Sequence, residues 1–278
     1  MMSHIQITVD ATDELSEMLI AELSQLGYDS FLEDDQNLVG SITEELFSEE
    51  ALTAMMERYK NAFPLTYKWE KVAPQNWNKL WESNYPYVIV NDRCAIKAAF
   101  HTLPKKYEYE IEITPKMSFG TGNHATTTLM LQSVLKYDFT DKSLLDLGTG
   151  TGVLFIMALM LGAKRAKACD IEEWAVENAI ENAEKNKVTN YEVFQGTVTD
   201  LPSDNLYDFV LANINKNVIL SELPAYANRL VENGVFMTSC FYESDLKDVE
   251  KMANANRLKM IHSDSLNNWV VGVFRKTE

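Results

Sequence analysis

The sequence predicts an α/β protein in which a small ferredoxin-like α+β domain precedes a doubly wound parallel sheet. Three observations support this fold class. From residue 87 onward, short apolar runs alternate with amphipathic stretches of helical period, and one of those runs ends in a glycine-rich loop. The first 70 residues show a different order of elements and a more acidic composition. A length of 278 residues is ordinary for two such domains.

The composition excludes several other classes of protein. Hydrophobic residues make up 46% of the chain and charged residues 24%, which is ordinary globular usage. The longest apolar run, Val153 to Leu161, is much shorter than the ~18 to 20 residues of a membrane helix. The first ten residues lack the basic and apolar regions of a secretory signal, so we expect a cytoplasmic protein without a membrane partner. Three widely spaced cysteines, with four histidines distant from them, predict neither a disulfide scaffold nor a metal site.

The net charge of −16 is concentrated near the N-terminus. Residues 1 to 70 contain 15 of the 41 acidic residues but only three of the 25 lysines and arginines, a net charge of −12. Such a field repels the phosphates of nucleic acids and speeds the encounter with a basic macromolecule at low salt. We therefore expect a basic partner and no direct recognition of nucleic acid. A solvated surface that only promotes solubility is the simpler alternative.

The first 70 residues predict strands and helices in the order βαββαβ, which is the ferredoxin-like arrangement. A strand over 4–9 alternates in hydrophobicity, and Thr12 or Asp13 is placed to cap a helix that Gly27 ends. The apolar positions of this helix follow the helical period at Leu15, Met18, Leu19, Leu23 and Leu26. The other predicted elements are strands over 28–32 and 37–42, a helix over 49–61 and a strand over 65–70.

Residues 71 to 86 are predicted to link the two domains. Trp77, Trp81 and Tyr85 are four residues apart between Pro74 and Pro86, which indicates a short helix with one aromatic face. Packing of this face against a domain is a simpler interpretation than contact with a cofactor.

Residues 87 to 278 are predicted to form the second domain, a parallel sheet with helices on both faces. The short connections between its strands and helices favour this doubly wound topology. The predicted strands cover 144–147, 167–170, 191–195, 209–212 and 235–239, and the predicted helices cover 153–161, 174–186 and 219–230, with Gly234 in a turn.

A glycine-rich loop carries the strongest signal for a ligand site. Asp146 to Gly152 reads DLGTGTG and lies where a buried strand is followed by a helix. Gly148, Gly150 and Gly152 allow a tight turn and a close approach to a ligand, and the helix N-terminus offers N–H groups to an anionic group. Val153 stands where the NAD fingerprint G-x-G-x-x-G/A needs a small residue, which disfavours NAD.

Two polar residues follow other strands of the predicted sheet. Asp170 ends the next strand, 22 residues after Gly148, where a carboxylate can accept both hydroxyls of a ribose. Alone it could be a helix cap, but together with the glycine loop it indicates a nucleoside-type cofactor. Asn213 follows the fourth strand, beside the crevice in which such sheets bind ligands, and an Asx turn is the alternative interpretation.

A second unusual run, FGTGNHATTT, covers residues 119–128. Its two glycines predict a flexible loop, and its hydroxyls and Asn123 are candidate caps for the helix that follows. His124 has no cysteine or carboxylate at ligand spacing, so we interpret it as a local hydrogen-bonding residue and not as a metal ligand or a base.

Four segments together resemble the family of methyltransferases that modify large-subunit ribosomal protein eleven. They are FGTGNHATT at 119–127, DLGTGTG at 146–152, LGAKRAKACDIEEWAVENAIENAEKN at 161–186 and ANI at 212–214. The first is specific to that family, whereas the G-x-G-x-G loop is shared by class I methyltransferases. The resemblance covers Trp77 to Trp269. The N-terminal domain is similar to the family's recognition domain in its type of fold more than in its amino-acid sequence.

The resemblance implies a Rossmann-like class I methyltransferase domain that uses S-adenosylmethionine. It implies methylation of lysine and N-terminal amines of a basic ribosomal protein. It also implies that the cofactor is contacted by Thr127, Gly148, Asp170 and Asn213, with 119–123 forming a loop near its methionine end. Asn213 is then also the catalytic residue that orients the acceptor amine.

The chain departs from the family's usual residues at two places, both on the side of the crevice where the methyl acceptor would bind. The residue after ANI is commonly Leu and is here Asn215, and the usual SGI after the fifth strand is here Ser239, Cys240 and Phe241. The identity of the target is therefore less well defined than that of the cofactor.

Other functions compete with this interpretation. Methyltransferases of adenine or of glutamine amides place N/D-P-P-Y/F after the fourth strand, whereas Ile214 and Asn215 follow Asn213 here. The acceptor could also be another protein or a small-molecule amine. A ribosome-assembly module that binds the cofactor without turnover is a different class again.

Overall fold

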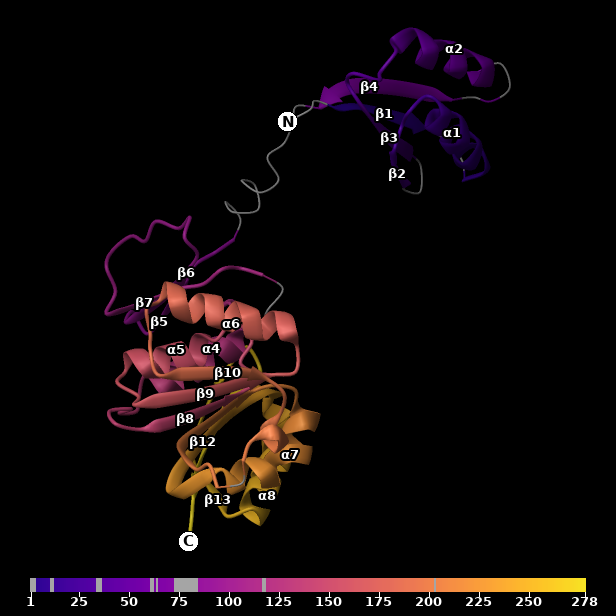
Figure 1. Cartoon of the computed structure of the whole chain (residues 1–278). Coiled ribbons are helices and arrows are strands. Elements are labelled where there is room, and N and C mark those ends of the chain that lie inside the picture. The colour runs from indigo at the N-terminus through magenta and orange to yellow at the C-terminus, as the bar shows by residue number, and fades with distance from the viewer. Residues whose placement is uncertain are drawn as a thin grey trace. The chain divides into compact units, whose positions relative to one another are not determined.

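The computed structural model describes residues 4–10, 13–33, 37–60, 63, 65–72, 85–116, 119–202 and 204–278. The chain divides into two compact units, Met1–Asn84 and Tyr85–Glu278 (Figure 1). Two of the predicted features, the cap at Thr12 or Asp13 and the linker helix with Trp77 and Trp81, involve residues or side chains outside this description.

The first unit has the strand order of a ferredoxin-like fold. Its elements are β1 (His4–Asp10), α1 (Asp13–Gln25), β2 (Ser30–Glu33), β3 (Asn37–Thr43), α2 (Glu49–Lys60) and β4 (Thr66–Val72). The strands lie in the order β2-β3-β1-β4, and all neighbours are antiparallel. Strand β4 ends at Val72, two residues beyond the domain boundary predicted at residue 70.

Alternating hydrophobicity explains the core of this unit. Ile5, Ile7 and Val9 of β1 are buried beside Leu19 and Leu23 of α1. The predicted apolar stripe of α1 is wrong at one position, because Met18 is 49% exposed. Helix α1 ends before Gly27, whose φ of +97° is readily available only to glycine.

The second unit contains a seven-stranded sheet in the order β10-β9-β8-β11-β12-β14-β13. Its strands are β8 (Ser143–Leu147), β9 (Arg165–Asp170), β10 (Tyr191–Gln195), β11 (Tyr207–Asn213), β12 (Leu230–Tyr242), β13 (Leu258–Leu266) and β14 (Trp269–Lys276). The first five strands in this order are parallel, as predicted, but β14 is antiparallel to β12 and to β13. The predicted parallel sheet is therefore confirmed for these five strands and is extended by β14 and β13, which the sequence analysis did not predict.

Helices cover both faces of this sheet (Figure 1). On one face lie α4 (Ala125–Val134), α5 (Val153–Met160) and α6 (Glu173–Lys185), and on the other lie α7 (Lys216–Asn228) and α8 (Leu246–Ala255). Each face has its own apolar core. Because β8 has a core on each side, its run Leu144, Leu145, Asp146 and Leu147 is buried throughout, as in central strands of parallel sheets.

A small three-stranded sheet precedes the seven-stranded sheet in the chain, and the sequence analysis did not predict it. It consists of β5 (Val88–Val90), β6 (Cys94–Lys97) and β7 (Tyr109–Glu112) in that order. Strands β5 and β6 are antiparallel, whereas β6 and β7 are parallel. The segment after β7 leads to the loop that begins at Phe119.

Strand β12 is irregular at two places. Tyr207 of β11 pairs with Leu230, but Phe209 pairs with Val235, so 231–234 form a bulge. The turn predicted at Gly234 is therefore a bulge inside a strand. A second shift, in the pairing of β12 with β14, lies between Thr238 and Phe241.

Asp146 is a buried acid at the junction of β8 and α5. Its side chain is 1% exposed, and the Thr149 hydroxyl donates to its Oδ2 at 2.7 Å. Burial raises the pKa of this carboxyl to about 7, although hydrogen bonds from Thr149 and the Phe155 backbone oppose the shift. The folded state therefore keeps a proton on Asp146 at pH values where the unfolded chain has lost it.

We expect the free energy of unfolding to fall as pH rises from about 4 to about 7, since the folded state binds the Asp146 proton more tightly than the unfolded state does. Asp146→Asn removes the titration. The free energy of unfolding of the wild type should fall by about 4 kcal/mol relative to that of the variant over this range. Urea unfolding at stepped pH measures the difference, and Asp204→Asn controls for the loss of one charge at an exposed site. Equal pH slopes in Asp146→Asn and wild type would contradict the buried proton.

Candidate active site

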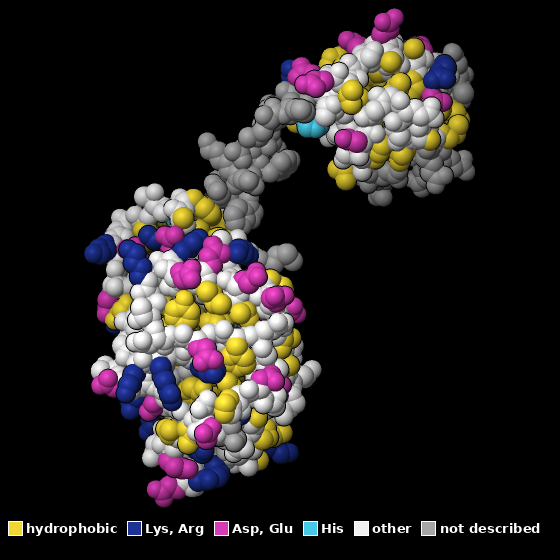
Figure 2. All heavy atoms as spheres, viewed as in Figure 1, with side chains coloured by type: hydrophobic (Ala, Val, Ile, Leu, Met, Phe, Trp, Pro, Cys, Tyr) yellow, Lys and Arg dark blue, Asp and Glu magenta, His cyan; other side chains and the backbone are white. Residues whose placement is uncertain are grey.

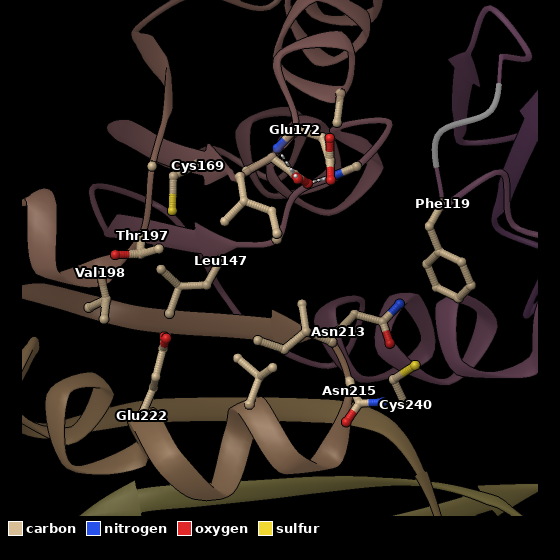
Figure 3. A pocket seen from close by; sticks show the side chains of 18 of the residues that line it. Phe119, Leu147, Cys169, Glu172, Thr197, Val198, Asn213, Asn215, Glu222 and Cys240 are labelled. Carbon is tan, nitrogen blue, oxygen red and sulfur yellow. Dashed lines mark hydrogen bonds between the residues drawn. The ribbon is translucent and has the colours of Figure 1, made fainter.

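A pocket of about 380 Å³ lies at the carboxyl ends of β8, β9, β10 and β11 (Figure 3). This is the edge at which doubly wound sheets bind ligands, and the volume suits a small molecule. The residues that line it follow these strands or come from α6, α7, β12 and the loop at Phe119: Phe119, Leu147, Gly148, Gly150, Cys169, Asp170, Ile171, Glu172, Trp174, Ala175, Gly196, Thr197, Val198, Asn213, Ile214, Asn215, Val218, Glu222, Tyr226 and Cys240.

The glycines of the loop after β8 are needed for contacts inside the protein. A Cβ on Gly148 would lie 2.2 Å from Cγ2 of Ile214, and one on Gly150 would lie 2.3 Å from the Phe119 carbonyl oxygen. Both have positive φ, which confirms the predicted tight turn. Gly152 does not line the pocket but is the N-cap of α5. The close approach predicted for a ligand is thus made, at Gly148 and Gly150, by protein atoms.

The backbone amides of this loop already have acceptors. Four consecutive N–H groups donate to protein oxygens at 2.9 to 3.0 Å: Thr149 to the Cys169 carbonyl, Gly150 to Asp170 Oδ2, Thr151 to the Phe119 carbonyl and Gly152 to the Thr149 carbonyl. The N–H groups of residues 149–152 are therefore not open to a ligand, whereas the prediction for the helix N-terminus that follows them stays a prediction. Their bonds instead fix the loop against β9 and the Phe119 segment.

Asp170 lies in the pocket at the end of β9, as predicted. Its Oδ2 accepts from the Gly150 N–H at 2.9 Å, and its Oδ1 accepts from the Glu172 N–H at 3.2 Å (Figure 3). Each carboxylate oxygen can accept a further hydrogen bond. The side chain is thereby held in place and retains capacity for two hydroxyl donors.

Asn213 ends β11 and also lines the pocket. Its side chain is 8% exposed, and its Nδ2 lies 3.5 Å from Oγ1 of the fully buried Thr127. Its Oδ1 is buried and has no hydrogen-bond partner among the residues that the structure describes. Thr127 is not among the residues that line the pocket, and its contact with the pocket is through Asn213. The predicted contact of Thr127 with a cofactor stays a prediction.

The Phe119 loop approaches the pocket from the side of Asn213 and Cys240 (Figure 3). Phe119 is 45% exposed, and its ring centroid lies 5.2 Å from that of His124. His124 is the N-cap of α4, because its Nδ1 accepts from the Thr126 N–H at 3.4 Å. This confirms His124 as a local hydrogen-bonding residue, but the expectation of Asn123 or a hydroxyl as the cap is wrong.

Asn182 is a structural residue of the site that sequence reasoning missed. It is fully buried on α6, donates from Nδ2 to the Thr151 carbonyl at 2.9 Å and accepts from the Thr114 N–H at 2.8 Å. In the predicted helix 174–186, Asn182 stands where the helical period places apolar residues, and this could have indicated its role. Asn182 thereby ties the glycine loop to the segment after β7.

Arg229 is a second residue that was missed. Its side chain is largely buried, and its guanidinium donates to the carbonyls of Leu201 at 2.7 Å and of Val198 at 3.2 Å, and to that of Pro202. These bonds hold the turn η1 (Val198–Asp200), which places Thr197 and Val198 in the pocket. No local pattern distinguishes this arginine from an exposed one.

The described part of the chain contains no group of three His, Cys, Asp or Glu side chains that could hold a metal ion. None of its helices is long and apolar enough to cross a membrane.

Similar proteins indicate the family of this chain. A family model described as ribosomal protein L11 methyltransferase (PrmA) matches residues 3–277. A protein of Bacteroides fragilis named ribosomal protein L11 methyltransferase is 35% identical over 278 residues, which cover 98% of this chain and 99% of that protein. A protein of Chlorobaculum tepidum with the same name is 34% identical over 94% of each chain.

Among solved structures, a ribosomal protein L11 methylase from Lactobacillus delbrueckii subsp. bulgaricus superposes with a TM-score of 0.64 and 24% identity. The match covers 70% of this chain and 100% of that one, and it shows the fold alone. The family model and the relatives extend over nearly the whole sequence. The chain therefore belongs to the ribosomal protein L11 methyltransferase (PrmA) family.

Proposed function

We propose that the pocket binds S-adenosylmethionine and that the chain methylates lysine and N-terminal amines of ribosomal protein L11 in the cytoplasm. The observation that carries this proposal is the buried Asn213 carboxamide, whose oxygen lacks a partner among the described residues. A buried acceptor without a partner costs about 1 to 3 kcal/mol, which a donor on an incoming amine would recover.

The pocket residues fit S-adenosylmethionine better than NAD. Asp170 can accept the two ribose hydroxyls, and the apolar side chains of Ile171 and Val198 can pack on an adenine ring. The loop amides at 149–152 already donate to protein oxygens, so they are not open to the pyrophosphate of a dinucleotide. When bound, the cofactor supplies a positively charged sulfonium with an electrophilic methyl group.

The acceptor must be present as a neutral amine. A free lysine with a pKa near 10.4 is neutral in only about 4 of 10,000 molecules at pH 7. Partial burial beside a cationic donor disfavours the ammonium form and makes a dedicated base unnecessary. The Asn213 oxygen would then accept an amine N–H and direct the nitrogen lone pair into the pocket.

The protein substrate is assigned from relatives and from charge. Relatives that align over nearly the full chain are named ribosomal protein L11 methyltransferase. Acidic side chains are prominent on the visible face of the first unit (Figure 2), consistent with the net charge of −12 over residues 1–70. We propose that residues 1–70 recognise the basic ribosomal protein, with 71–86 as linker and 87–278 as catalytic domain.

A methyl-transfer assay separates the proposed function from its rivals. Labelled S-adenosylmethionine is incubated with the full chain and an unmodified ribosomal lysate, and mass spectrometry identifies the product. Label on L11 lysines or its N-terminus is the expected result. Label on another protein or on a small amine would change the acceptor, and cofactor binding without transfer would favour a binding module.

Asp170→Ala should weaken binding of S-adenosylhomocysteine about 10- to 100-fold, because it removes a charged acceptor of hydroxyl hydrogen bonds. Asp170→Asn keeps the size of the side chain and should have a smaller effect. Isothermal calorimetry measures both, and wild-type affinity in the alanine variant, or tight NAD binding by the wild type, would rule out the proposed role.

Asn213→Ala should lower the single-turnover methylation rate about 10²- to 10³-fold at saturating cofactor, the scale for loss of one positioned hydrogen-bonding group. Thr127→Val removes the hydroxyl behind Asn213 and should lower the rate about tenfold through misorientation of the amide. Near wild-type rates in Asn213→Ala would make Asn213 a turn residue only.

Asn213→Asp should be as slow as the alanine variant at pH 7 and recover partly toward pH 10. A carboxylate keeps an acceptor but raises the pKa of the amine beside it, so the ammonium form persists until higher pH. Rates from pH 7 to 10 test this, and a profile parallel to that of Asn213→Ala would contradict it.

Replacement of Glu45, Glu49 and Glu50 by Gln should lower kcat/KM for the ribosomal protein at low salt, because it removes three exposed acids from the first unit. The wild-type rate should also fall as salt rises.

The matched control is the triple replacement of Glu177, Asp204 and Asp248, which are exposed acids of the second unit. It changes the net charge equally and should have a smaller effect. Equal effects of the two triple variants, or a salt-independent rate, would favour a merely solubilising charge.

A further inference from the structure

Cys240 has an unusual backbone conformation inside strand β12. Its φ is +77°, in the left-handed region that glycine adopts freely and other residues rarely adopt. The pairing of β12 with β14 shifts between Thr238 and Phe241, so Cys240 lies in a β-bulge. The chain thus carries a side chain at a position whose backbone favours glycine.

The bulge directs this side chain to the pocket. Cys240 lines the pocket, and Figure 3 shows its sulfur on the same side as the Asn213 amide, with Phe119 beyond them. An independent observation indicates a ligand there, because Asn213 is 8% exposed and its Oδ1 has no partner among the described residues. Cys240 therefore lines the same pocket as Asn213, the group that we assign to the acceptor amine, and directly follows Ser239, which pairs with Asn213 in the sheet.

The Cys240 thiol is suited to affect an acceptor amine through its volume and not through charge or hydrogen bonding. Burial raises its pKa, so it remains a neutral thiol near pH 7 and does not offer a competing thiolate nucleophile. A thiol is also a weak hydrogen-bonding group, so it does not replace Asn213 as the acceptor for an amine N–H.

Resting on the proposed function, we propose that Cys240 is a specificity-determining residue that limits how many methyl groups an acceptor amine can carry. Each turnover forms one N–C bond, breaks the S–C bond of the sulfonium and, counted from the ammonium form, releases one proton to solvent. Every added methyl enlarges the amine that must fit beside Cys240 and Asn213 in the next turnover. The sulfur therefore retards the later transfers more than the first.

The test is a graded series at residue 240 with unmethylated ribosomal protein L11 as substrate. Cys240→Ala and Cys240→Gly remove volume stepwise, and glycine also suits the positive φ, so neither is expected to impair folding. The ratio of third to first methylation rate constants, from time-resolved mass spectrometry, should rise from Cys to Ala to Gly. The change to glycine should reach about tenfold, the scale for one group in a tight pocket. Cys240→Met should lower the ratio.

Asn233→Gly is the matched control. Asn233 also has a positive φ, of 64°, in the same strand, but it is exposed and does not line the pocket. Its replacement should leave the ratio at the wild-type value. A ratio that is unchanged across the residue 240 series, while the wild type methylates L11, overturns this inference alone. Binding of S-adenosylhomocysteine without any transfer by the wild type overturns the proposed function and this inference together.

Discussion

The Asn182 side chain links two segments on which the geometry of the pocket depends. It donates to the Thr151 carbonyl in the glycine loop and accepts from the Thr114 N–H after β7. Because Asn182 is fully buried, loss of either bond would leave a buried polar group unpaired, which is costly. The Thr151 hydroxyl and N–H extend this network to the carbonyls of Gly120 and Phe119. The loop at Phe119, the glycine loop and helix α6 are therefore joined by hydrogen bonds along one side of the site.

The hydrogen bonds that the glycine-loop N–H groups already make affect which ligands the pocket can bind. A glycine loop with open amides would attract phosphate, whereas this loop directs its N–H groups at residues 149–152 into the protein. Polar side chains set among the apolar walls of the pocket, the carboxylate of Asp170 and the carboxamide of Asn213 among them, are then the groups open to a polar ligand. The Asn213 carboxamide is itself contacted by the buried Thr127 hydroxyl, whose oxygen lies 3.5 Å from its Nδ2.

The charge of the chain is divided unevenly along the sequence, which fits the division into recognition and catalysis that we propose. Residues 1–70 carry −12 of the total −16, so the remaining sequence is only weakly acidic. A field of one sign raises the rate of encounter with a basic protein, whereas the transfer of a methyl group depends on alignment within the pocket. In the second unit, Arg229 serves local structure, because its guanidinium donates to the carbonyls around η1.

The sequence by itself determined the strands and helices next to the glycine loop and the edge of the sheet at which the pocket lies, but not β5 to β7, β13, β14 or α8. Periodicity and glycine placement are local, so β10 was predicted with its observed bounds, and Asp170 and Asn213 were correctly placed at the carboxyl edge, where parallel strands must end together. Only the tertiary structure decided the antiparallel insertion of β14, the partners of the loop amides, the position of Thr127 behind Asn213 and the left-handed bulge at Cys240. These features arise from pairings between residues distant in sequence, such as Thr114 and Asn182, which are 68 positions apart. A local pattern does not encode which distant group completes a hydrogen bond, because that choice is made by the packing of the whole domain.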